Sequence, residues 1–129
     1  MFISIDPSDD VAIYEQVVRQ VVFAVAGDAL KTGEIIPSVR ELARELAINP
    51  NTVARAYRQL QADGILESVR GTGLAVSEGA GPRCQQERLK LLRARLRQVL
   101  IEAKQSRLDK AALRALVEEE MTAIERGEV

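Results

Sequence analysis

The sequence predicts a mainly helical protein with one small β-hairpin, and three observations support this. Two helical segments joined by a short turn lie between about residues 38 and 62. Two β-rich segments, residues 65–68 and 74–77, follow them around a loop, residues 70–73, that contains two glycines. Two long amphipathic helical segments without a predicted strand make up the rest of the 129-residue chain. A helix–turn–helix followed by such a hairpin is the plan of a winged helix-turn-helix, which holds one helix in a DNA major groove.

The N-terminal part is predicted to contain a short strand and a long helix. Phe2-Ile3-Ser4-Ile5 is rich in β-formers and ends at Asp6-Pro7, which favours a short strand. Asp9 or Asp10 is expected to cap a helix of about residues 11–29. The apolar positions of this helix recur at helical spacing and are Ile13, Tyr14, Val17, Val21, Ala24 and Val25.

The two helices of the helix-turn-helix have clear start signals. Ser38 and Glu41 form the pattern of a capping box for a helix that is expected to reach about Ala47. Asn49-Pro50 supplies a cap and a proline at the first helical position of the second helix, and Asp63-Gly64 is expected to end it. The inner faces of the two helices are apolar and consist of Val39, Leu42, Ala43, Leu46, Val53, Ala56, Tyr57 and Leu60.

Polar residues of this region are the candidate DNA contacts. In a helix-turn-helix, the N-terminal end of the second helix comes within reach of base edges. Asn51 is suited to adenine and Arg55 to guanine, while the Thr52 hydroxyl is suited to a phosphate. Arg40 lies near the start of the helix that crosses the DNA backbone, so we expect it to contact a phosphate. The complete predicted set is Ser38, Arg40, Arg44, Asn49, Pro50, Asn51, Thr52, Arg55, Arg58, Arg70, Gly71 and Thr72.

Each of these residues also has a purely structural interpretation. Asn49 can cap its helix, and we favour that role over a DNA contact. Arg40 and Arg44 are four residues apart and are either solvated surface residues or phosphate contacts, of which we favour the second for Arg40. For Arg55 we favour a DNA contact, because apolar side chains already occupy the inward face of its helix. Arg70 lies beside glycines that permit close backbone approach, which favours a groove or phosphate contact.

The C-terminal part is predicted to be a two-helix dimerisation tail. Residues 78–82 are expected to link a winged helix-turn-helix domain, residues 1–78, to an α-helical region, residues 82–127. The expected helices cover about residues 83–105 and the segment that follows Asp109. Their apolar stripes consist of Leu89, Leu92, Leu96, Val99 and Leu100, and of Leu113, Leu116, Val117, Met121 and Ile124. Because two helices of this size cannot bury both stripes alone, we expect a four-helix interface with a second copy.

Composition argues against several classes of protein. The chain has no histidine and one cysteine, Cys84, so we expect no enzyme, no metal site and no cofactor. Its net charge of −1 is low for a DNA-binding protein, but residues 31–73 hold six bases against five acids, so positive charge is local. No apolar run approaches the ~20 residues of a membrane helix, and the N-terminus lacks the pattern of a signal peptide. A cytoplasmic protein without membrane contact is therefore expected.

Four motifs in order resemble the GntR family of bacterial transcription regulators. They are Tyr14-Glu15-Gln16-Val17, Pro37-Ser38-Val39-Arg40-Glu41-Leu42-Ala43, Asn49-Pro50-Asn51-Thr52-Val53-Ala54-Arg55-Ala56-Tyr57 and Arg70-Gly71-Thr72-Gly73. The resemblance covers about residues 8–77, and the short tail is similar to that of the YtrA subfamily, whose C-terminal region mainly dimerises. By length, the chain lacks room for the effector domains of other subfamilies. The resemblance implies DNA contacts by Arg40, by Asn49, Asn51 and Thr52, and by Arg70 and Gly71 at the wing tip.

Some positions depart from the pattern of the family. Pro50 and Ala54 stand where better-known members have arginines, so we expect Arg55 to take over part of the base readout. Ala75 stands where an aromatic residue is common. Val22-Phe23 replaces charged residues and is either an extra contact surface or covered by the tail helices, of which we favour the second. A signal is expected to act at a cleft between this pair and residues 79–81.

The sequence as a whole predicts a homodimeric, sequence-specific transcription regulator that represses at an inverted-repeat operator. Its expected partners are double-stranded DNA, a second copy of the chain and an unidentified small-molecule effector. One alternative is a DNA-binding architectural or accessory protein without ligand control. A second alternative is an interaction adaptor with the same fold, which Arg40, Arg55 and Arg70 on the expected DNA face argue against.

Overall fold

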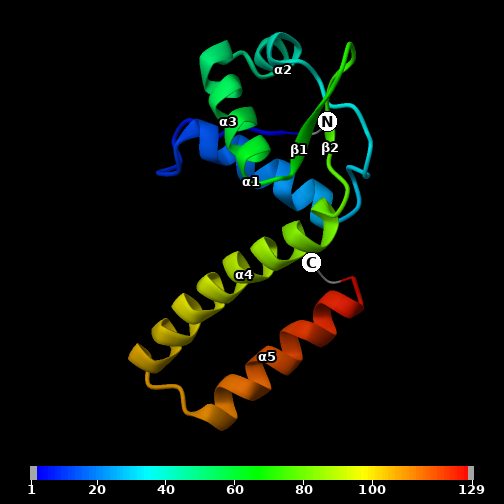
Figure 1. Cartoon of the computed structure of the whole chain (residues 1–129). Coiled ribbons are helices and arrows are strands. Elements are labelled where there is room, and N and C mark those ends of the chain that lie inside the picture. Colours follow the sequence, from blue (N-terminus) through cyan, green and yellow to red (C-terminus); the bar gives the residue numbers. More distant parts are fainter. Residues whose placement is uncertain (1–2, 128–129) are drawn as a thin grey trace. The chain divides into compact units, whose positions relative to one another are not determined.

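The computed structural model describes residues 3–127 (Figure 1). These residues form two compact units that divide after Lys90. The elements, in chain order, are α1 (Ile13–Ala26), α2 (Val39–Leu46), α3 (Pro50–Ala62), β1 (Leu66–Val69), β2 (Gly73–Val76), α4 (Ala80–Gln105) and α5 (Lys110–Glu125). This confirms the predicted class, mainly helical with one small hairpin. Among the described residues, no helix has both the length and the apolar character needed to span a bilayer.

The core of the first unit is built around α3. This helix packs against α1 on one side and α2 on the other. Tyr57 lies at the centre of the core, and its hydroxyl donates a 2.8 Å hydrogen bond to the carbonyl of Pro37. Burial raises the pKa of Tyr57, so the hydroxyl stays protonated and keeps donating to the loop before α2. The other side chains with an exposed fraction of 2% or less are Val17, Val21, Leu42, Val53, Ala56, Leu60, Ile65, Leu66, Ala75, Val76, Ala80 and Cys84.

The predicted caps of the helix-turn-helix are confirmed. The Ser38 hydroxyl accepts a hydrogen bond from the Glu41 amide, and the Glu41 carboxylate accepts one from the Ser38 amide. The Asn49 side chain accepts from the Asn51 amide at 2.8 Å. Between the helices, Ala47 has a φ of 54°, a left-handed conformation that costs a residue with a Cβ roughly 1 kcal/mol or more. The turn between α2 and α3 is therefore tight and slightly strained.

Each strand of the hairpin is shifted by one residue from its predicted position, and a third segment, residues 33–36, pairs with β2. Leu66 of β1 pairs with Val76 of β2, and both side chains are buried. Backbone hydrogen bonds join Gly33 to Val76, Glu34 to Val76 and Ile36 to Leu74. The loop before α2 thus covers the outer edge of β2. Ala75, which stands where an aromatic residue is common in the family, is buried beside this loop at the Ile35–Ala75 bridge.

The predicted N-terminal strand is wrong for residues 3–5, and Phe2 lies outside the described residues. Instead, the amide side chains of two α1 residues pair with the backbone of this segment. Gln20 exchanges two 2.8 Å hydrogen bonds with Ser4, and Gln16 both accepts from the Asp6 amide and donates to its carbonyl. These amides satisfy the backbone groups that a neighbouring strand would otherwise satisfy.

The start of α1 also differs from the prediction. Its N-cap is Ala12, which makes no capping hydrogen bond through its side chain, so neither Asp9 nor Asp10 caps the helix. Asp9 instead accepts a hydrogen bond from the Val11 amide in the turn before it. The Gln16 side chain, which donates to the carbonyl of Val11, ties that turn to the helix.

The predicted linker is wrong, because α4 already begins at Ala80. Gly79, with a φ of 77°, makes the turn into the helix, and Pro82 lies in the first turn, where a missing N–H is tolerated. Ala80 and Cys84 are buried in the core of the first unit, which extends to Lys90. The beginning of the tail helix is thus a structural part of the winged module.

In the second unit, the predicted start of α5 is confirmed, since the Asp109 side chain accepts a hydrogen bond from the Ala112 amide. The apolar stripes of the two helices are exposed within the single chain. The exposed fraction is 54% for Leu96 on α4 and 62% for Ile124 on α5. No residue of α5 is buried.

Candidate nucleic-acid interface

The first part of the candidate interface is the outer face of α2. Arg40 and Arg44 are exposed and lie one turn apart, while Leu42 and Ala43 on the opposite side are buried in the core. The capping box holds Ser38 at the N-terminus of the same helix. Amphipathicity therefore directs both guanidinium groups away from the core, as contact with a phosphate backbone requires.

The second part is the start and exposed face of α3. Asn49, Pro50 and Asn51 are exposed at its N-terminus, and Thr52 is partly exposed. The Asn49 side chain is engaged as the cap, which confirms the structural role favoured from the sequence. Asn51, Arg55 and Arg58 follow one another at spacings of four and three residues, so they share one face of the helix.

Arg55 has a partner that the sequence did not reveal. Its guanidinium carbon lies 3.7 Å from the centroid of the Tyr14 ring on α1. In the sequence, Tyr14 was counted only among the apolar positions of its helix. Helical spacing describes neighbours along one helix, so it could not reveal a contact with another helix. Next to this pair, Tyr14, Glu15, Val18, Arg19, Gln59 and Asp63 line an open groove of about 370 Å³ between α1 and α3.

The third part is the tip of the hairpin. Arg70, Gly71 and Thr72 are all exposed, and the Thr72 amide donates to the Val69 carbonyl at 3.0 Å, which closes the turn. Gly71 has a φ of 77°, and nothing lies within 4 Å of the position that a Cβ would take there. Glycine is thus required for the backbone conformation, and the open space leaves the tip free to approach a nucleic acid.

The structure brings α2 and the wing together. Ser38 and Thr72 line the same cleft of about 280 Å³, whose other walls include Ile35, Ile36, Pro37, Val39, Glu41, Tyr57, Gly73 and Leu74. Figure 1 shows the loop of the hairpin and α2 at the same end of the first unit. Ser38 at the start of α2 and Thr72 of the wing, both predicted contacts, therefore lie on one continuous surface.

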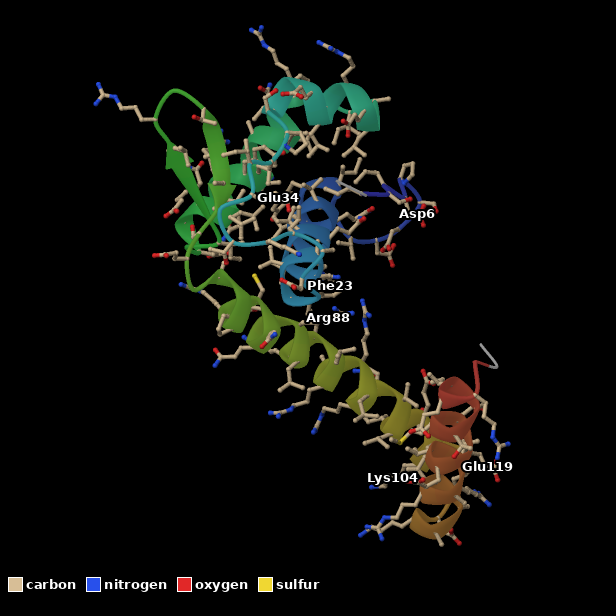
Figure 2. All side chains as sticks on the ribbon, turned by 90° about the vertical axis from the view of Figure 1, so that its right-hand side faces the viewer. Asp6, Phe23, Glu34, Arg88, Lys104 and Glu119 are labelled. Carbon is tan, nitrogen blue, oxygen red and sulfur yellow. The ribbon has the colours of Figure 1, made fainter. Side chains whose placement is uncertain are left out.

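Arg88 at the beginning of α4 lies over one member of the Val22-Phe23 pair of α1. Val22 is buried, and Phe23 is partly exposed with the Arg88 guanidinium carbon 5.1 Å from its ring centroid (Figure 2). The coverage by the tail helices that was favoured from the sequence is thus shown for Phe23, through Arg88. Because Val22 is inside the core, the prediction that it lines a signal-binding cleft is wrong.

In the described part of the chain, no cluster of three or more His, Cys, Asp or Glu side chains could hold a metal ion. The one cysteine, Cys84, is buried in the core, and burial raises the pKa of its thiol to about 11. At neutral pH it is a protonated, apolar packing residue.

A tight helix-turn-helix with polar residues at the start of its second helix, joined to a hairpin with an arginine at its tip, defines a winged-helix DNA-binding protein. The family model described as bacterial regulatory proteins, gntR family, matches residues 13–76. The chain belongs to this family, and it is a DNA-binding transcription regulator.

Known relatives resemble the chain beyond the winged module. The HTH-type transcriptional repressor YtrA of Bacillus subtilis is 39% identical over 101 residues, which cover 78% of each chain. The crystal structure of a transcriptional regulator from Oenococcus oeni has a TM-score of 0.77 at 29% identity and covers 93% of this chain and 99% of its own. YtrA from Sulfolobus acidocaldarius, a GntR-family transcription factor, has a TM-score of 0.58 at 32% identity and covers 73% and 97%.

Proposed function

We propose that this protein is a homodimeric repressor that binds an inverted-repeat operator in the cytoplasm. The observation that carries the proposal is the exposed apolar stripe of α4 in a chain of this family. The repressor role is proposed from the similarity to the YtrA repressor of Bacillus subtilis. The small-molecule effector stays a prediction, and no ligand class is proposed for it.

Dimerisation is supported by the spacing and exposure of the stripe. Leu89, Leu92, Leu96, Val99 and Ala103 alternate spacings of three and four residues, which is the a/d pattern of a coiled-coil seam. Four of these five side chains are exposed large hydrophobics. The stripe on α5 adds Leu116, Val117, Met121 and Ile124, which are exposed as well. Burying both stripes against a second copy removes this apolar surface from water.

A symmetric dimer supports an inverted-repeat operator. In a two-fold dimer, the two winged modules are related by rotation, so each meets the same half-site in the opposite orientation. We propose that Arg40, Arg44 and Thr52 contact phosphates, that Asn51, Arg55 and Arg58 lie towards the base edges, and that Arg70, Gly71 and Thr72 contact the DNA beside the recognition helix.

Selection of duplexes from a random-sequence library by the full chain tests this proposal. The expected product is an inverted repeat whose half-sites are about one helical turn apart, with two chains bound to each duplex. Sequencing gives the site, and analytical ultracentrifugation of the complex gives the stoichiometry. Selection of a single half-site or of a direct repeat would contradict the symmetric dimer. Equal binding to all duplexes would favour the architectural alternative.

Arg40→Ala is expected to weaken binding to every duplex, selected or random, because a phosphate contact carries no sequence information. Loss of one phosphate contact per chain should also reduce the slope of log affinity against log salt by about 1 per chain. Arg126→Ala, which removes an exposed arginine after α5, is the matched control and should change neither quantity. An affinity loss confined to the selected duplex would instead make Arg40 a base-reading residue.

A further inference from the structure

The stack of Arg55 on Tyr14 joins the recognition helix to α1 at the edge of the proposed DNA surface. Arg55 is exposed, yet its guanidinium carbon lies only 3.7 Å from the ring centroid of Tyr14. A cation at this distance over an aromatic face is attracted by the quadrupole of the ring. The arginine is therefore held in one place although no protein surface encloses it.

Stacking leaves the hydrogen-bonding capacity of the guanidinium unused. Its five N–H donors point outward in the plane of the group, whereas the ring contacts only the flat face. Among the side-chain hydrogen bonds of residues 3–127, none involves a donor of Arg55. The edge of the group is thus available for a pair of acceptors outside the protein, such as the O6 and N7 atoms of guanine or two phosphate oxygens.

We infer that Tyr14 is a positioning residue that holds the Arg55 guanidinium ready for a bidentate contact with DNA. The inference rests on the proposed function. An arginine that is already ordered loses less rotamer entropy on binding, so the stack increases affinity without touching the nucleic acid. The ring provides this effect, because the Tyr14 hydroxyl donates only a long hydrogen bond of 3.4 Å, to the carboxylate of the neighbouring Glu15.

A double-mutant cycle in the full chain tests this, with the duplex selected by the wild-type protein as the probe. Tyr14→Leu removes the ring and keeps apolar bulk, and it should lower affinity about threefold to tenfold. Tyr14→Phe keeps the ring and should stay within about twofold of wild type. In an Arg55→Ala background, Tyr14→Leu should have no further effect on affinity, because the group that it positions is gone.

The four proteins of the cycle, which are the wild type, Tyr14→Leu, Arg55→Ala and the double variant, are also unfolded in urea, which distinguishes positioning from a structural contact. The inference is supported if the coupling free energy between Tyr14 and Arg55 is larger for operator binding than for unfolding. The inference would be overturned if Tyr14→Leu weakened binding equally with and without Arg55. It would also be overturned if the two residues were coupled in unfolding but not in operator binding. A duplex of random sequence shows whether Arg55 contacts a base or a phosphate. If Arg55 reads a base, Arg55→Ala should lose affinity only for the selected duplex, and if Arg55 contacts a phosphate, the variant should lose affinity for both duplexes. Failure of the wild-type protein to select a duplex would count against the proposed function instead.

Discussion

A chain carrying Leu96→Asp is expected to be monomeric and to bind its selected operator about 10²- to 10⁴-fold more weakly than the wild-type protein. Leu96 is 54% exposed in the single chain and lies in the middle of the proposed seam, between Leu92 and Val99. A carboxylate there stays hydrated in the monomer, but in the dimer it would be buried without a partner. The loss is large because the second half-site is then no longer bound at high effective concentration. Sedimentation equilibrium and operator titration measure the two effects.

Gln98→Asp is the matched control for this experiment. Gln98 is exposed on the same helix, two residues from Leu96 and therefore on a different face, so the same charge should leave dimerisation and affinity close to wild type. Urea unfolding of both variants checks that the first unit is intact. A Leu96→Asp protein that remains a dimer, or a monomer that binds as tightly as wild type, would show that the seam does not join two copies.

A chain that ends after Ser77 is expected to be about 2 kcal/mol less stable than one that ends after Lys90, because about 0.8 kcal/mol is lost for each buried CH₂-sized group that is removed from the core. The shorter chain lacks Ala80 and Cys84, which are 1% and 0% exposed, and the Arg88 side chain that lies over Phe23. The predicted boundary at residue 78 would therefore cut through the core of the winged module. Urea unfolding of the two fragments measures the difference.

A substitution in the full chain provides an independent check where the shorter fragment fails to fold. Cys84→Ala creates a small cavity at the contact between α4 and the core, and it should lower stability in the same direction by a smaller amount. Cys84 is the appropriate site because it is fully buried while its neighbours Arg83 and Gln85 are exposed. Gln85→Ala is the matched control and should have little effect. Equal unfolding midpoints for the two fragments would mean that residues 78–90 add nothing to the core.

Local signals explain why the helix-turn-helix could be predicted from the sequence. A capping box joins Ser38 to a residue three positions away, and the Asn49 cap joins residues two positions apart, so both can be recognised without a fold. The inner faces of α2 and α3 follow from helical spacing in the same way. The polar and basic residues left on the outer faces are the predicted contacts, and the structure shows them exposed, with Thr52 partly so. Their contacts with DNA stay predictions.

What the sequence by itself determined was the presence of the helices, the caps at Ser38, Asn49 and Asp109, and the apolar face of each helix, because these depend on residues close together in the chain. Only the tertiary structure decided which distant groups meet. Gln16 and Gln20 replace a neighbouring strand, Ala80 makes the expected linker part of the core, and Arg55 stacks on Tyr14. Each of these depends on how two elements cross, which no spacing along one element encodes. The glycines and the proline near residue 80 suggested a linker, but these residues are also tolerated in the first turn of a helix. The sequence does not show that this turn packs against the core, so the helix start was missed.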